Sequence, residues 1–187
     1  MLLMSRVLVL ATCCVFVSSP AAAQETPLFE LSGGYTFLQA EKFTFLPDGT
    51  LDGSGQAFHG WVGSITVNLS PALGLTGELG GNYWRAFGID LRSLLVGPRV
   101  TVRRGHVSMF AQVLLGAEQI STALAPGFGA STFALQPGAG IDFWTTPNVA
   151  IHVGADYRRV FENAERPRAG SNQFRLHGGL AVAAGQR

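Results

Sequence analysis

The sequence is poor in charged residues. Asp, Glu, Lys and Arg make up 13% of its 187 residues, about half of the quarter that is usual in a soluble domain. Lysine is nearly absent, since Lys42 is the only one. The 13 basic residues balance 12 acidic ones without a basic cluster. This composition excludes acidic or basic tail proteins and coiled coils, and it argues against a nucleic-acid partner, which requires a basic surface.

The start of the chain has the features of a secretory signal peptide. Arg6 supplies a positive charge, residues 7–17 form an apolar run, and residues 18–23 end in an Ala-x-Ala site. The run is shorter than the roughly 20 residues that a membrane-spanning helix needs. We therefore expect residues 1–23 to be removed by cleavage, leaving one domain over residues 24–187. A lipoprotein signal ending at Cys13 is an alternative, although the apolar run continues beyond that residue.

Cysteine is absent from the expected mature chain, because Cys13 and Cys14 both lie in the signal peptide. Residues 24–187 therefore offer no disulfide, no thiol nucleophile and no cysteine metal ligand. They also lack a run of 18 apolar residues, which excludes a transmembrane helix in this part of the chain. An exported domain of this kind depends on backbone pairing and packing for its stability.

Apolar and polar residues alternate with a period of two along eight segments, the pattern of β-strands. Each segment is about 10 to 14 residues long, compared with about 5 to 6 for globular strands and about 9 to 11 for a tilted strand that spans a membrane. The eight predicted strands are residues 28–38, 57–69, 73–85, 91–103, 105–118, 131–143, 149–160 and 172–182.

The connectors between these strands differ in length on the two sides. Those after the second, fourth and sixth strands are short, at residues 70–72, 103–104 and 144–148. Those after the first, fifth and seventh are longer, at residues 39–56, 119–130 and 161–171. Short turns on the periplasmic side and longer loops outside are typical of an outer-membrane barrel. The longer connectors are the expected exposed surface.

Aromatic residues gather near the ends of the predicted strands. With the longer connectors outside, one group lies near the outer ends: Tyr35, Phe37, Trp61, Tyr83, Trp84, Phe133, Tyr157 and Phe174. A second group lies near the inner ends: Phe29, Phe143 and Trp144. Two aromatic belts at the membrane interfaces are a feature of outer-membrane barrels. Core aromatics of a soluble barrel are the alternative, but that alternative does not explain the grouping.

The polar face of the strands is the best guide to which side faces inward. It consists mainly of Gly, Ser, Thr, Asn and Gln, whereas a solvent-exposed face carries many Lys and Glu. Its few charges suit a narrow, filled interior, where each charge must be paired. We therefore predict an interior polar network of Glu30, Glu78, Arg99, Glu118, Asp142, Asp156, Arg158 and Arg175. A soluble barrel would instead place its apolar face inside.

Two prolines and several histidines need separate consideration. Pro98 and Pro137 fall inside predicted strands and remove ladder donors, so we expect either β-bulges or a different strand register there. His106 and Ser108 share a strand face, the pairing that nucleophilic catalysis uses, but no acid is placed to orient the histidine. His152 and His177 lie on the inward face of neighbouring strands, where interior hydrogen bonding is favoured over metal binding. The sequence predicts no cofactor.

Four segments carry a resemblance to a known family: residues 95–102 (LVGPRVTV), 135–143 (LQPGAGIDF), 149–158 (VAIHVGADYR) and 172–180 (NQFRLHGGL). With the eight-strand layout, residues 24–187 resemble the small outer-membrane β-barrels related to OmpA and OmpX. The resemblance implies insertion into the bacterial outer membrane by the barrel-assembly machinery, contact with outer-membrane lipid, and a role as anchor, adhesin or receptor. Family members usually end on an aromatic residue that belongs to the assembly signal, whereas residues 181–187 here are AVAAGQR.

The sequence therefore predicts an all-β fold, an eight-stranded antiparallel up-and-down transmembrane β-barrel preceded by a cleaved signal peptide. The expected function is a structural or surface-interaction role without catalysis, with an unknown partner at the surface loops. Two alternatives stay open: an outer-membrane lipid-modifying enzyme, and a soluble lipocalin-like barrel that binds an apolar ligand.

Overall fold

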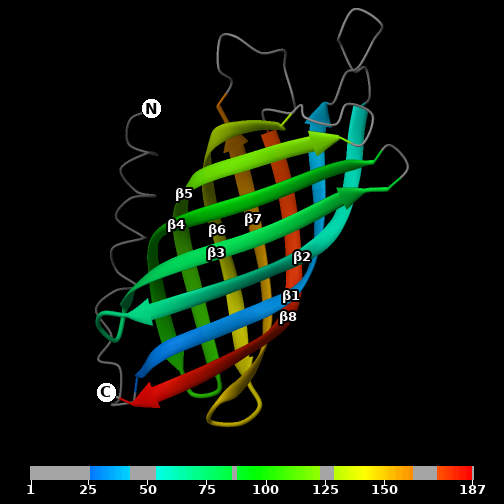
Figure 1. Cartoon of the computed structure of the whole chain (residues 1–187). Helices are drawn as coiled ribbons and strands as arrows, with labels where there is room; N and C mark the ends of the chain where they lie inside the picture. Colours follow the sequence, from blue (N-terminus) through cyan, green and yellow to red (C-terminus); the bar gives the residue numbers. More distant parts are fainter. Residues whose placement is uncertain (1–25, 43–53, 86–87, 123–128, 162–171, 187) are drawn as a thin grey trace, which may run out of the picture.

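The computed structural model describes residues 26–42, 54–85, 88–122, 129–161 and 172–186 (Figure 1). The expected signal peptide, residues 1–23, lies outside the described residues. The described chain forms eight strands: β1 (Pro27–Lys42), β2 (Ser54–Asn68), β3 (Leu73–Trp84), β4 (Ile89–Arg104), β5 (Val107–Thr122), β6 (Gly129–Trp144), β7 (Val149–Val160) and β8 (Asn172–Gln186). No helix in these ranges is long and apolar enough to cross a membrane.

The strands form a closed antiparallel barrel in sequence order, and β8 pairs with β1 to complete it. The predicted eight-stranded antiparallel up-and-down barrel is confirmed. Figure 1 shows the strands tilted around the barrel, with the short turns β2–β3, β4–β5 and β6–β7 at one end, called the turn end here. The opposite end, where β1, β3, β5 and β7 finish, is called the loop end.

Several strands are longer than the alternation predicts. Most of the additional residues lie at the loop end, whereas those of β8 (residues 183–186) lie at the turn end. The β1–β2 ladder continues to the pair Lys42 and Ser54, and the β5–β6 ladder to Ser121 and Gly129. Backbone hydrogen bonds sustain a hairpin after the apolar and polar alternation has faded. Parts of the predicted connectors 39–56 and 119–130 are therefore strand.

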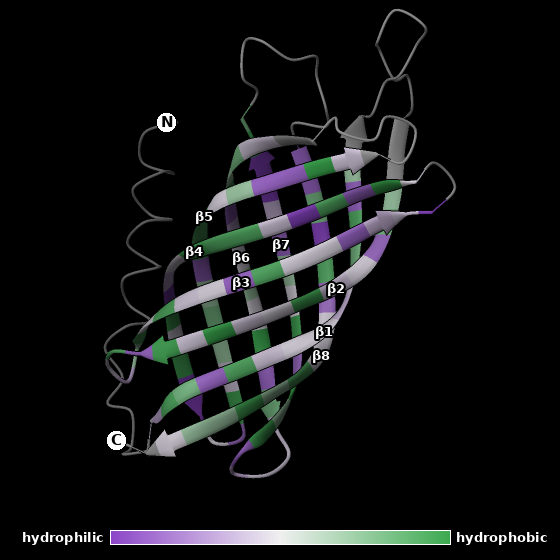
Figure 2. Ribbon diagram, in the orientation of Figure 1, coloured by the Kyte–Doolittle hydropathy of each residue, from purple (hydrophilic) through white to green (hydrophobic). Residues whose placement is uncertain are grey.

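The polarity of the barrel is reversed relative to a soluble protein. Large apolar side chains face outward, with Leu94 61% exposed and Leu79 53% exposed. Polar side chains such as Thr36, Gln136 and Asp142 face inward and are fully buried. In Figure 2 the strands accordingly alternate between hydrophobic and hydrophilic residues along their length. A lipocalin-like barrel requires the opposite arrangement, so that alternative is wrong in its assignment of the faces.

The bulges expected at Pro98 and Pro137 are absent. Both prolines face outward, and Pro98 pairs in regular register with Leu75, as Pro137 does with Val113. The backbone pairing is interrupted only on the other side of each proline, between β4 and β5 and between β6 and β7. Beyond each gap the strands pair in the same register. Successive residues of a strand direct their N–H groups to opposite neighbours. Each proline therefore loses a donor towards one strand only, and the register survives.

The aromatic residues divide between the outer surface and the interior. Tyr35, Trp61, Phe133, Tyr157 and Phe174 face outward near the loop end, and Phe29 and Phe143 face outward near the turn end. Trp84 and Trp144 do not belong to the outward belts, because strand alternation turns each of them inward relative to its neighbour. Trp84 packs against interior apolar residues, and the Trp144 indole donates to the Ser108 hydroxyl at 2.8 Å.

Candidate functional site: the barrel interior

At the turn end, the carboxylate of Glu30 on β1 binds side chains from β2 and β4. It accepts hydrogen bonds from Arg103 and, at 2.8 Å, from Asn68 Nδ2, and it lies 3.7 Å from Arg99 Nη2. Arg103 also donates to the carbonyl of Pro71 at 2.6 Å. This end of the interior is therefore tied to the β2–β3 turn.

Arg99 of β4 occupies the next level of the interior. Its Nη2 donates to Asp142 Oδ2 at 2.9 Å, and the other oxygen of Asp142 contacts His152 Nδ1. The guanidinium carbon of Arg99 lies 3.7 Å from the centroid of the Phe110 ring. Phe110 in turn stacks on His152, with the two rings 4° from parallel. A cation, an aromatic ring and an imidazole thus form one stack, in which cation–π attraction adds to the ion pair.

Arg175 of β8 connects opposite walls of the barrel. Its Nη2 donates to both carboxylate oxygens of Glu78 on β3 at 2.8 Å and to Asp156 Oδ2 on β7 at 2.6 Å. His177 Nε2 lies 3.1 Å from the same Asp156 oxygen, and its ring lies 5.1 Å from that of His152. The two histidines therefore link the Arg175 group to the Arg99 group.

Arg158 of β7 forms the level nearest the loop end. Its Nη1 donates to Glu118 Oε2 at 2.6 Å, and its Nε donates to Gln136 Oε1 at 2.7 Å. Gln136 Nε2 donates to Glu78 at 3.1 Å, and Gln173 Nε2 donates to Glu118 at 2.6 Å. Charged and amide side chains therefore form a continuous polar network from Glu30 to Glu118. Buried charges are tolerable only with such partners.

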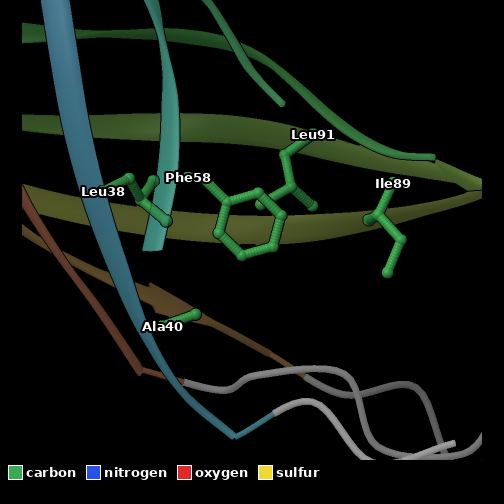
Figure 3. Close-up of a cluster of buried hydrophobic side chains, with 5 residues drawn as sticks. All are labelled: Leu38, Ala40, Phe58, Ile89 and Leu91. Atoms are coloured by element: carbon green, nitrogen blue, oxygen red, sulfur yellow. The ribbon is translucent and has the colours of Figure 1, made fainter. Parts of the chain in front are cut away.

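The interior becomes apolar at the loop end. Figure 3 shows the buried residues that form what we call the apolar layer: Leu38, Ala40, Phe58, Ile89 and Leu91. All five are at most 2% exposed, and Trp84 and Ile120 pack against them. A second interior cluster consists of Leu95, Leu114, Ala134 and Val160. Together with Trp84 of β3, the two clusters place apolar side chains on seven of the eight strands.

The eight predicted network residues all lie inside the barrel, and each forms at least one ion pair. Sequence reasoning missed Arg103, which was assigned to a turn although it shares strand parity with Arg99. It also missed the bridging amides Gln136 and Gln173. The apolar layer was missed because the prediction described the inward face by its polar residues alone. The sequence signal for this layer is that Ile89 and Leu91 occupy the alternate strand positions that face inward.

The candidate His106 and Ser108 pair is not assembled for catalysis. Both line a cavity of about 790 Å³ at the turn end, together with Arg103, Trp144 and Asn148. The Ser108 hydroxyl is buried and accepts from Trp144, and within the described chain no hydrogen bond joins it to the exposed His106. No group of three or more His, Cys, Asp and Glu side chains in the described ranges is arranged as a metal site.

No protein-family profile matches the chain, and no curated protein sequence matches it significantly. Solved structures do match. Neisserial surface protein A superposes with a TM-score of 0.66 at 14% identity, over 83% of this chain and 96% of that one. The amino-terminal barrel of OprF from Pseudomonas aeruginosa gives 0.55 at 12% identity, over 85% and 98%. Ail, the attachment invasion locus protein of Yersinia pestis, gives 0.50 at 15% identity, over 82% and 96%.

This chain has the fold of the small outer-membrane β-barrels. At identities this low the likeness concerns the fold alone. The polar network and the apolar layer rest on the side-chain contacts of this chain and are not inferred from the similar structures.

Proposed function

We propose that the protein is an integral β-barrel of the bacterial outer membrane that supports surface loops without conducting solutes or catalysing a reaction. The observation that carries this proposal is the combination of an outward apolar wall with an interior that side chains fill from the polar network to the apolar layer, leaving a cavity only at the turn end of the described barrel. The wall accounts for membrane insertion, and the filled interior accounts for a scaffold role.

The outward wall is the surface that a bilayer requires. In hydrocarbon, every backbone N–H and C=O needs an internal partner, which a closed sheet provides. The described strands close without a free edge, and their outward side chains between the two ends are apolar or small. A water-soluble domain exposing this wall would aggregate, because large apolar patches are unfavourable in water. Export by a signal peptide and insertion by the assembly machinery are part of the proposal.

The filled interior supports the absence of a pore. An eight-stranded barrel has room for little more than side chains. Here the polar network occupies the turn end and middle, and the apolar layer closes the loop end. An ion crossing the apolar layer would lose its hydration without gaining a polar partner. The layer is therefore the proposed permeability barrier.

A surface role is consistent with the structural relatives. Neisserial surface protein A is a surface protein by name, and the Yersinia protein is named for attachment and invasion. We propose the same general location for this chain, with its longer connectors as the contact surface. Mass spectrometry of lipid A from cells with and without the protein tests the non-catalytic part, and an altered acyl pattern would contradict it.

Conductance in planar bilayers tests the absence of a pore. We expect no steady conductance from the folded wild-type barrel. The double substitution Phe58→Ser and Leu91→Ser should produce measurable single-channel steps, because it makes the apolar layer polar. The matched control is Leu94→Ser, which changes an outward position of the same strand and should remain silent. Steady conductance of the wild type would contradict the proposal, as would silence of the folded double variant.

A further inference from the structure

The aromatic belt at the loop end is interrupted on the outer surface of β4. Tyr35 on β1 pairs with Trp61 on β2, Trp61 pairs with Gly81 on β3, and Gly81 pairs with Arg92 on β4. Arg92 is therefore an exposed, outward cation at the same height on the barrel wall as the aromatic residues Tyr35 and Trp61. Among the described residues, no hydrogen bond or ion pair of its guanidinium is found.

The side chains beside Arg92 bring polar atoms together over the backbone of Gly81. The Trp61 indole donates to the Tyr83 hydroxyl at 3.1 Å. A Cβ atom at Gly81 would lie 2.7 Å from that hydroxyl oxygen and 2.8 Å from the indole nitrogen. Both polar atoms thus lie directly on the glycine that pairs with Arg92. The Tyr83 hydroxyl accepts from Trp61 and keeps its own proton available for donation.

The surface immediately below this polar group is apolar. Leu79 and Leu94 form the next outward pair towards the turn end, and they are among the most exposed apolar side chains of the barrel. A ligand that contacts both the polar group around Arg92 and the apolar surface of Leu79 and Leu94 needs an anionic oxygen group attached to a hydrocarbon chain. A lipid with a headgroup phosphate has this structure, whereas a free anion can contact only the polar group around Arg92.

We propose that Arg92, Tyr83 and Trp61 form a binding site for the phosphate of a membrane lipid, whose acyl chain lies along Leu79 and Leu94. The site rests on the proposed function, because it requires the barrel to stand in a bilayer. Arg92 supplies the charge, and the tyrosine hydroxyl supplies a hydrogen bond at a fixed position. Asp90, which pairs with Tyr83, is the nearest outward carboxylate on these strands and opposes anion binding.

Binding of phosphatidic acid to the folded barrel tests the site. The barrel is held in maltoside micelles and titrated with phosphatidic acid, with diacylglycerol of the same chains, and with inorganic phosphate, and native mass spectrometry counts the bound lipid. We expect phosphatidic acid alone to bind saturably. Arg92→Gln should weaken its binding about fivefold, Arg92→Lys should retain most of it, and Asp90→Asn should strengthen it.

Arg159→Gln is the matched control, because Arg159 is another exposed outward arginine at the loop end, on β7. It should change binding by less than twofold. If Arg92→Gln and Arg159→Gln weaken phosphatidic acid binding equally, the lipid responds to general positive charge and the site is overturned. The site is also overturned if Arg92→Gln binds the lipid as well as the wild type does. Equal binding of diacylglycerol, or competition by millimolar inorganic phosphate, would also overturn it. Gel mobility before boiling reports folding separately, so failure of the wild type to fold in micelles counts against the proposed function instead.

Discussion

Adjacent residues of one strand face different steric limits in this barrel, and Gly33 and Gly34 of β1 show the difference. Gly33 faces outward, and a Cβ there would find its nearest neighbour at 3.7 Å. Gly34 faces inward, and a Cβ there would lie 2.2 Å from the carbonyl oxygen of Gly178. The inner side of a narrow barrel brings neighbouring backbones close, so only the inward glycine is required by packing.

Gly34→Ala is therefore expected to destabilise the barrel by about 1–3 kcal/mol or more, because the clash is with backbone that cannot move aside. Gly33→Ala should leave stability nearly unchanged. Urea unfolding of the two variants in micelles, followed by tryptophan fluorescence, measures the difference. Similar unfolding midpoints for the two alanine variants would contradict the assigned faces.

Removing the charge at Arg175 tests the polar network. Arg175→Met leaves the carboxylates of Glu78 and Asp156 buried without their main cation, which should cost about 3–5 kcal/mol. Arg159→Gln removes an exposed arginine and should cost no more than about 1 kcal/mol. Unfolding midpoints of both variants provide the comparison. If Arg175→Met lowers the unfolding midpoint no more than Arg159→Gln does, the guanidinium is not needed to stabilise the buried carboxylates, and the account of the network is contradicted.

Strand existence and facing were predictable from the sequence because both follow from a period of two. The alternation placed Glu78, Asp156 and Arg175 on the inward face without any structure. Their pairing across the barrel was not predictable, because it depends on which strands face each other after closure and on the reach of each side chain. The role of Arg103 followed the same parity rule, but the prediction also counted this residue in the short connector 103–104 and left it out of the network.

At the scale of elements, the strands of this barrel tolerate a proline where the sequence pattern suggested a bulge. Pro98 and Pro137 both sit at outward positions and interrupt the ladder on one side only. Sequence reasoning correctly identified the missing donor but could not determine which neighbour it faced. That direction is set by the closed order of the strands, in which β4 has partners on both sides.

Pro98→Ala restores a backbone donor towards β5 and should keep or raise the unfolding midpoint. Val96→Pro is the matched control two residues away, where the ladder with Leu115 is intact. It removes a hydrogen bond in the apolar region and should lower stability by several kcal/mol. Heat-induced loss of the folded gel band measures both. A lower midpoint for Pro98→Ala than for the wild type would contradict this account of the ladder.

On the scale of the whole molecule, the barrel has two different fillings. The polar network from Glu30 to Glu118 holds the walls together, and the apolar layer closes the loop end. The sequence predicted the first filling from its few balanced charges. It did not predict the second, because Leu38, Ile89 and Leu91 are indistinguishable by type from outward-facing residues, and only their position in the strand alternation places them inside.

The central claim is that this closed barrel stands in the outer membrane with its apolar wall in lipid. The most direct measurement is fractionation of cells producing the full chain, followed by electrophoresis of boiled and unboiled samples. The account predicts that the protein, cleaved after Ala23, is recovered with the detergent-extracted outer membrane and migrates differently after boiling. Recovery as a soluble periplasmic protein without a mobility shift would contradict it.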